Sequence, residues 1–406
     1  MSIFLLIALA MVIMVLMLRR RLPVGLAVLA TGAVLWLGTG AQPMKLVRAF
    51  EQMLVLPRNY NLLGALYLII CLEIILRKSG ILAGMVRALH RMFASAKFTV
   101  AAMPAFLGLL PSIGGARFSA PIVEQASVGL IVSAERKAAI NYWFRHVNEY
   151  CCPMMTAMIL TSGITGASMG DLILHLGWVS VACFVIGWLV LMTPIKQGAK
   201  VESQDEDGDP HRDRVDFVLA LIPVTISVAL MVTTSLPAPA SMFAAVISLI
   251  VLAKIYGRWA NVKEIFLGAL DKKMFFNVTC ILFFIQVLAV TGTLDAIVSG
   301  VQDLGLPVPV VVALIAFLVG MLTGQSQGHI SMVMPIVAAL TGADLQLIGV
   351  GYVFGMAGEM ITPAHLCMVI SSDYFKSDFV RFWWQIFAIQ MIVLAIFAAW
   401  TYLMWI

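Results

Sequence analysis

Two short stretches of this chain share one pattern, in which a glutamate precedes a proline by four residues: Glu149-Tyr150-Cys151-Cys152-Pro153 and Glu359-Met360-Ile361-Thr362-Pro363. Both stretches lie inside apolar runs. Proline has no backbone N–H and clashes with the preceding helical turn, so each helix is expected to break there. A helix that breaks inside a membrane is tolerated only where it lines a cavity or is buried in protein. One such break in each half of a chain is typical of secondary transporters.

The composition indicates that both stretches belong to a membrane protein. Apolar residues make up 62% of the 406 residues and charged residues only 12%, and the mean hydropathy is +1.00. Ten apolar segments approach or exceed the length that spans a bilayer: about 2–18, 22–40, 60–77, 138–162, 172–192, 215–233, 237–256, 274–290, 346–372 and 381–405. We therefore expect an all-α polytopic protein of the lipid bilayer.

Two further apolar segments, 98–131 and 308–341, are interrupted near their middles by small polar clusters. The clusters are Pro111-Ser112-Ile113-Gly114-Gly115-Ala116-Arg117 and Thr323-Gly324-Gln325-Ser326-Gln327-Gly328-His329. Each arm has about 11–16 residues, which is short for a spanning helix. We expect two re-entrant helical hairpins, each of which enters and leaves the membrane on the same side.

Three anchors recur in the same order in the two halves of the chain. They are Ser79-Gly80-Ile81-Leu82 with Thr291-Gly292-Thr293-Leu294, Pro121-Ile122-Val123 with Pro335-Ile336-Val337, and the two Glu-x-x-x-Pro stretches. The pattern indicates a duplication of 1–196 as 215–406, joined by a polar cytoplasmic linker over 197–214. Five spans in each copy is an odd number, so the second copy is expected to be inverted. The two hairpin tips should then lie near the midplane of the bilayer.

The distribution of charge predicts the orientation of the chain. If both termini lie outside, most of the 26 Lys and Arg residues fall in cytoplasmic loops or at cytoplasmic helix ends, as the positive-inside rule requires. The net charge of +5 comes mainly from these residues and indicates no nucleic-acid partner. We expect a prokaryotic inner-membrane protein.

The order of a hairpin and then a broken helix, in two inverted copies, resembles the ion transporter superfamily, which includes divalent-anion/sodium symporters and gluconate-type permeases. Within that group the chain most resembles a prokaryotic integral-membrane family of unknown function. Dicarboxylate transporters of the group typically carry Ser-Asn-Thr at each tip, whereas this chain has Ser112-Ile113-Gly114 and Gln325-Ser326-Gln327. The resemblance implies an elevator mechanism and a homodimer.

Polar residues at the tips and breaks are candidates for binding a small organic anion. Arg117 could grip a carboxylate in bidentate fashion beside the Gly114-Gly115 amides. Alternatively, it pairs with Glu124 or extends to the membrane surface. The candidate substrate-binding residues are Ser112, Gly114, Gly115, Arg117, Ser119, Asn148, Gln325, Ser326, Gln327, Gly328, Ser331 and Thr362.

Four residues are candidates for ion coupling: Glu149, Glu359, His329 and His365. A carboxylate in a medium of low dielectric constant can take up and release a proton, and histidine titrates near neutral pH. The alternatives are that the glutamates cap the broken helices, that Glu149 pairs with Arg145 at i,i+4, and that the histidines are hydrogen-bonded packing residues. The six cysteines are expected to be reduced core residues.

These features favour a secondary active transporter of a carboxylate-type anion, coupled to a proton or sodium gradient, with no cofactor beyond bound Na+ or a proton. Two alternatives remain: a membrane subunit of a multicomponent carrier with an external binding protein, and an intramembrane enzyme. Against an enzyme, no Asp-x-x-x-Asp pair lies within a predicted span.

Overall fold

The computed structural model of the protein describes residues 3–20, 22–92, 95–109, 115–197, 209–234, 236–258, 261–303, 305–363 and 365–405. Most of these residues lie in helices. One short antiparallel pairing joins strand β1 (Leu130–Ile131) to strand β2 (Lys196–Gln197), with Leu130 opposite Gln197. Apart from this pairing, the expected all-α class is confirmed for the part of the chain that is described.

The first half of the chain forms α1 (Ile3–Arg19), α2 (Val24–Gly38), α3 (Pro43–Val55), α4 (Pro57–Lys78), α5 (Ile81–Met92), α6 (Ala96–Leu109), α7 (Gly115–Ala126), α8 (Ala134–His146), α9 (Thr156–Thr165) and α10 (Met169–Gly187). A 3-10 helix, η1 (Val147–Tyr150), follows α8. A π-helical turn, η2 (Trp188–Met192), extends α10.

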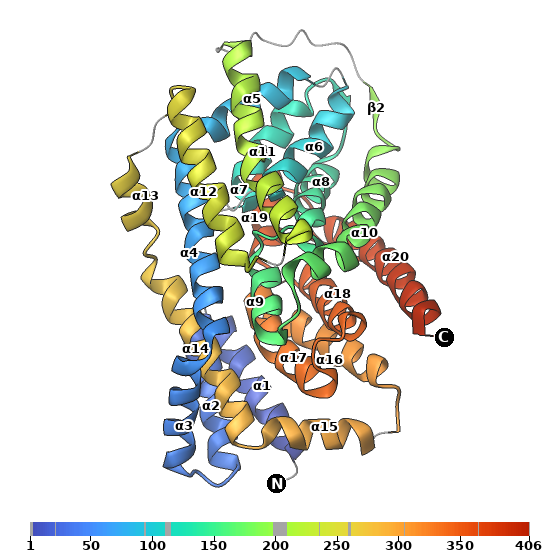
Figure 1. The fold of residues 1–406 in the computed structure, drawn as a ribbon. Coiled ribbons are helices and arrows are strands. Elements are labelled where there is room, and N and C mark those ends of the chain that lie inside the picture. Colours follow the sequence, from blue (N-terminus) through green and yellow to red (C-terminus); the bar gives the residue numbers. More distant parts are fainter. Residues whose placement is uncertain are drawn as a thin grey trace. The chain divides into compact units, whose positions relative to one another are not determined.

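The second half forms α11 (Pro210–Thr233), α12 (Ala238–Ile255), α13 (Val262–Gly268), α14 (Lys272–Val290), α15 (Thr293–Asp303), α16 (Val308–Thr323), α17 (Ser326–Thr341), α18 (Leu345–Ile361), α19 (Leu366–Phe375) and α20 (Phe379–Trp405) (Figure 1). This series repeats the first one element by element. In both, a pair of apolar helices (α6 and α7, α16 and α17) precedes a broken helix (α8 and α9, α18 and α19). The duplication itself stays a prediction.

Every predicted span contains a helix. Seven helical stretches have at least 18 residues and are apolar enough to cross a membrane: Pro57–Lys78, Met169–Met192, Pro210–Thr233, Ala238–Ile255, Lys272–Val290, Leu345–Phe375 and Phe379–Met404. Helices α1 and α2 are slightly shorter, at 17 and 15 residues. The chain is a multi-pass membrane protein.

The predicted hairpins correspond to α6 with α7 and to α16 with α17. The segment 308–341 matches the second pair from end to end, and its turn is formed by Gly324 and Gln325. In the first pair, the connection at 110–114 lies outside the described residues. Helices α3, α5, α13 and α15 lie outside the segments that were predicted as spans or hairpins.

Both Glu-x-x-x-Pro stretches interrupt a helix as expected. Helix α18 ends at Ile361, and Thr362 has extended backbone angles (φ −76°, ψ 132°). A residue that precedes a proline is driven out of the helical region by contact with the proline ring. In the first copy the α-helix already ends at His146, and η1 carries Glu149 toward Pro153.

The chain divides into two compact units. Unit 1 consists of Met1–Gly64, Ile159–Ser168 and Leu270–Ala364, and unit 2 consists of Ala65–Met158, Met169–Ala269 and His365–Ile406. Each unit therefore combines the first three helices of one copy with the hairpin and the upstream half of the broken helix of the other copy. Two of the crossings between the units lie near the breaks: the chain passes into unit 1 after Met158, five residues beyond Pro153, and out of it after Ala364, one residue beyond Pro363.

Within unit 2, buried ion pairs join α5 to α11. The Asp213 carboxylate accepts hydrogen bonds from Arg87 Nη2 at 2.8 Å and Arg91 Nη1 at 2.5 Å, and its side chain is 1% exposed. Nearby, Arg258 pairs with the buried Asp216. Helices α5 and α11 run side by side (Figure 1).

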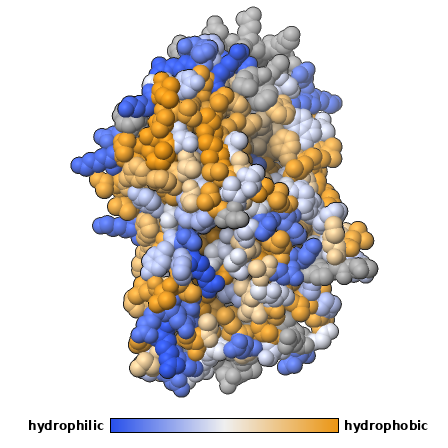
Figure 2. Space-filling view, in the orientation of Figure 1, coloured by the Kyte–Doolittle hydropathy of each residue, from blue (hydrophilic) through white to orange (hydrophobic). Residues whose placement is uncertain are grey.

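The outward side of α12 is apolar. Phe243, Ile247, Val251 and Ile255 recur every four residues along this helix and are exposed, and Figure 2 shows apolar side chains over it. An exposed apolar stripe on a long apolar helix is expected where the helix faces lipid.

Candidate functional site

The tip of the second hairpin, in unit 1, is built on a left-handed glycine. Gly324 has φ +61°, a backbone angle that glycine adopts without strain, and its N–H donates to the Gly320 carbonyl at 2.9 Å. Gln325 is extended, and its carbonyl accepts the N–H groups of Gly328 at 3.0 Å and His329 at 3.3 Å. This turn starts α17 with Ser326 in its first position.

Three predicted site residues meet just beyond this tip. Ser326 Oγ donates to Glu359 Oε1 at 3.0 Å, and His329 Nδ1 lies 3.3 Å from Glu359 Oε2. The His329 side chain is fully buried, and the Glu359 side chain is 3% exposed. The hairpin and the broken helix of the second copy thus form a buried Ser–His–Glu cluster, which we call the tip cluster.

Glycines on α16 and α18 allow the tip cluster to form. A Cβ atom on Gly355 would lie 2.5 Å from His329 Cδ2, and one on Gly320 would lie 2.0 Å from the Gly355 carbonyl oxygen. A Cβ on Gly358 would lie 2.0 Å from the Phe317 carbonyl oxygen. The backbones of α16 and α18 therefore approach closely, as small residues allow in membrane helices.

The other predicted residues of the second copy surround this tip. Gln325 is exposed, Gln327 is half-buried and Thr362 is buried at the end of α18. Ser331 is buried, and its hydroxyl donates to the Gly328 carbonyl one turn earlier at 2.9 Å. That bond keeps the Ser331 hydroxyl on its own helix.

Part of the first tip lies outside the described residues. These include Ser112 and Gly114, and the Arg117 side chain is also not described. Gly115 opens α7. Ser119 is fully buried and donates to the Ala116 carbonyl at 3.4 Å, much as Ser331 does in the second copy. The anion clamp at Arg117 remains a prediction.

In unit 2, the first broken helix caps the end of α6. Asn148 Nδ2 donates to the Ala105 carbonyl at 2.7 Å, Arg145 Nη1 to the Leu107 carbonyl at 3.3 Å, and Cys152 Sγ to the Leu109 carbonyl at 3.4 Å. The last carbonyls of a helix lack intrahelical donors, and a cation is favourable at that end. Asn148, a predicted substrate ligand, is bonded to the hairpin backbone here.

Glu149 lies beside a histidine of its own helix. His146 Nε2 is 3.8 Å from Glu149 Oε1, and His146 Nδ1 donates to the Tyr142 carbonyl at 2.6 Å. The α-helix ends at His146, so Arg145 and Glu149 are not spaced along one α-helix, although the charges of the two residues interact. Each duplicated glutamate therefore has a histidine close to it, from its own helix in the first copy and from the hairpin in the second.

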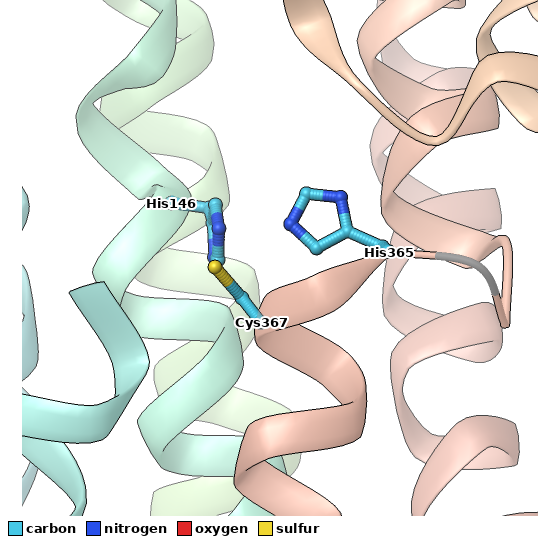
Figure 3. A group of neighbouring side chains, drawn as sticks. All are labelled: His146, His365 and Cys367. Atoms are coloured by element: carbon cyan, nitrogen blue, oxygen red, sulfur yellow. The ribbon is translucent and has the colours of Figure 1, made fainter. Parts of the chain in front are cut away.

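His365 belongs to unit 2, whereas the residues of the second tip belong to unit 1. Its ring centroid is 5.2 Å from that of His146 and 5.4 Å from that of Tyr142. Together with Cys367 these histidines form a compact group in which α8 and α19 contribute side chains from different copies (Figure 3). Asn141 adds a bond from α8 to Ser371 Oγ on α19 at 2.9 Å.

Two residues of this group, His146 and Cys367, were not among the predicted site residues. His146 had one usable signal, since it lies one helical turn before Glu149. Cys367 had none, because a cysteine within an apolar segment is far more often a packing residue. Only the contact between α8 and α19 shows that they belong together.

The fold also occurs in a protein of known structure. The YdaH transporter of Alcanivorax borkumensis superimposes with a TM-score of 0.61 over 88% of this chain and 86% of its own, at 13% sequence identity. No curated protein matches the sequence. A family model described as "Protein of unknown function (DUF401)" matches residues 2–405. The chain therefore belongs to the DUF401 family of proteins of unknown function.

Proposed function

We propose that this protein is a secondary active transporter that moves a small, carboxylate-type organic anion together with protons. Broken helices and short hairpins within a multi-pass fold are the architecture that alternating-access carriers use. A protein with the same fold carries the name transporter. The observation that carries the coupling proposal is the buried contact between His329 and Glu359.

The tip cluster is suited to hold and release a proton. A carboxylate and an imidazole 3.3 Å apart, both buried, can share one proton, and adding or removing it changes the net charge of the cluster. A net charge in a buried site is costly, so protonation favours whichever conformation of the carrier best solvates or neutralises it. Hard cations such as Na+ prefer oxygen ligands, and the imidazole occupies one side of the carboxylate. The tip cluster therefore favours protons over sodium.

The anion would bind at the start of α17. The first N–H groups of a helix have no intrahelical acceptor and attract anions. The side chains of Gln325, Ser326 and Gln327 flank these groups and are exposed or half-buried. Gly328 keeps the turn narrow, because a Cβ there would lie 2.9 Å from Thr323 Cβ.

The finer features of the carrier follow from the resemblance to inverted-repeat transporters. We include in the proposal an elevator mechanism, a homodimer, and a prokaryotic inner membrane. The division into two compact units supports movement of one unit relative to the other. Cross-linking of the purified protein would test the dimer.

Transport by the purified chain in proteoliposomes tests the proposal. We expect an inward proton gradient to drive accumulation of at least one anion from a panel of mono- and dicarboxylates, and a sodium gradient at uniform pH to drive none. In Glu359→Gln the amide oxygen can still accept from Ser326, but the side chain cannot titrate. This variant should lose gradient-driven accumulation and retain exchange of labelled for unlabelled anion.

Glu264→Gln is the matched control, because Glu264 is half exposed and pairs with Lys78 on the surface of unit 2. Its uptake should equal that of the wild type. Proton-driven accumulation by Glu359→Gln at the wild-type rate would contradict the coupling role of the tip cluster. Failure of the chain to move any anion under either gradient, with uptake restored by a second co-purified subunit, would favour the multicomponent carrier instead.

A further inference from the structure

Three metal-binding side chains converge inside unit 2. One ligand atom from each of His146, His365 and Cys367 lies within 4.8 Å of the other two. Both histidines are buried, with 5% and 7% of their surfaces exposed, and Cys367 is partly buried. Figure 3 shows the Cys367 sulfur next to the His146 ring, and the His365 ring directed toward the same space. A conformational change of side chains alone could bring the three atoms onto one ion.

The hydrogen bonds of His146 prepare it to be a ligand. Its Nδ1 donates to the Tyr142 carbonyl at 2.6 Å, and because a carbonyl can only accept, the proton must be on Nδ1. Nε2 then carries the lone pair. Metal-bound histidines commonly donate their second ring N–H to a carbonyl or carboxylate, which fixes the tautomer and the orientation of the ring.

Glu149 could add a carboxylate oxygen to these three ligand atoms. Glu149 Oε1 lies 3.8 Å from His146 Nε2, the nitrogen that carries the lone pair. The four side chains supply two neutral imidazoles, one thiolate and one carboxylate. This donor set suits tetrahedral Zn2+, which binds Cys, His and carboxylate ligands. Its two negative charges balance a divalent ion, so the occupied site would be neutral within the apolar interior.

We propose that His146, His365, Cys367 and Glu149 bind one Zn2+ ion. The ion would fasten α19, which begins just after the second break, to α8, which ends just before the first one. Arg145 is close enough to interact with the charges of Cys367 and Glu149, so its guanidinium competes with the metal for them. The proposal assigns the duplicated glutamates different tasks: Glu359 handles protons and Glu149 binds metal.

Metal binding by the full-length protein in detergent tests the proposal. The protein is purified without a polyhistidine tag, stripped with a chelator, and titrated with Zn2+ against a competing indicator. We expect one high-affinity Zn2+ per chain. Cys367→Ser, which nearly preserves the shape of the side chain, and His365→Gln should each weaken binding by more than about tenfold, because even outer contacts of a metal site contribute that much. Arg145→Gln should strengthen it.

Cobalt gives a readout that depends on the sulfur. Substituted Co2+ should produce a thiolate-to-metal charge-transfer band in the wild type but not in Cys367→Ser. Cys183→Ser, which alters another buried cysteine of unit 2, and His211→Gln, which alters an exposed histidine, are controls that should bind as the wild type does. Equal Zn2+ affinity in the wild type and Cys367→Ser, or a wild type that binds no Zn2+, would overturn the proposal. Thermal unfolding of each metal-free variant would verify that it is folded.

Discussion

At the scale of single residues, the position of His329 depends on the missing side chain of Gly355. A methyl group on residue 355 would lie 2.5 Å from the imidazole Cδ2, and the ring is fully buried. Gly355→Ala should therefore displace His329 from Glu359 and lower the free energy of unfolding by about 1–3 kcal/mol, as overpacking of a core does. The unfolding temperature in detergent and the rate of proton-driven uptake should both be lower than in the wild type.

Gly177→Ala is the control for this substitution. Gly177 also lies within a helix, α10, but a Cβ there would meet nothing closer than Cys151 Cβ at 3.9 Å. Since alanine is the better helix former by about 1 kcal/mol, this variant should unfold at the same or a slightly higher temperature. If both variants lost equal stability, the contact between His329 and residue 355 would not explain the loss in Gly355→Ala.

The candidate site could be predicted from the sequence only in part. Ser326, His329 and Glu359 could be named because each is a polar residue in an apolar segment, at a tip or a break. His329 and His365 appeared to belong together, yet the structure places them in different units. Such groupings depend on contacts between helices, and no periodicity in the sequence records them.

At the scale of elements, the two copies share one close contact between hairpin and broken helix. In the first copy a Cβ on Gly108 would lie 2.1 Å from the Arg145 carbonyl oxygen, and in the second a Cβ on Gly320 would lie 2.0 Å from that of Gly355. Arg145 thus occupies the place that Gly355 has in the second copy. The duplicated backbone contact persists while the side chains around it have diverged.

The shared contact predicts that both glycines are required. Gly320→Ala should force α16 away from α18, and Gly108→Ala should force α6 away from α8, because a backbone carbonyl cannot rotate aside as a side chain can. Each variant should lose about 3 kcal/mol of stability, at the upper end of the usual range for overpacking. If either variant unfolded at the wild-type temperature, its pair of helices could move apart at little cost in stability, which would contradict the prediction.

The ion pairs between α5 and α11 depend on Asp213. Asp213→Asn would remove the charge that accepts hydrogen bonds from two partly exposed arginines, and hydrogen bonds to a charged group contribute about 1.5–3 kcal/mol. By contrast, Lys78→Gln removes a pair whose side chains are 48% and 51% exposed, and such pairs contribute about 0–1 kcal/mol. Denaturation of the two variants in parallel would measure the difference. Equal losses would show that burial of Asp213 is unimportant.

Sequence patterns located the long apolar elements and missed the short amphipathic ones. The segment 308–341 and both breaks were located because apolar runs, glycines and prolines mark them directly. No span or hairpin was predicted at helix α5, although Ile81, Met85 and Leu89 recur along it and are fully buried. A spacing of four residues places these three side chains on one helical face.

At the scale of the whole molecule, the distribution of charge predicts that both chain ends face away from the cytoplasm. A reporter enzyme that is active only outside the cytoplasm, fused after Ile406, should be active. The same reporter fused after Asp209, in the linker between the copies, should be inactive. The reverse result would show that the positive-inside rule fails for this protein.

The division into compact units could not be foreseen from the repeats. Duplication suggests two halves that fold side by side, one from each copy, whereas each unit contains helices from both. Hydropathy identifies where a helix lies in the chain, and it does not identify which other helix covers its apolar face. That choice depends on shape, as in the glycine contacts of α16 with α18.

This exchange of helices has a consequence for the origin of the protein. Each unit contains segments from both halves of the chain. If the predicted inverted duplication holds, an ancestor with a single copy would have needed a second molecule, inserted in the opposite orientation, to cover its apolar faces, and gene fusion would then have joined the two. The two halves produced as separate polypeptides in one cell should accordingly reassemble into an active carrier, while either half alone should be degraded.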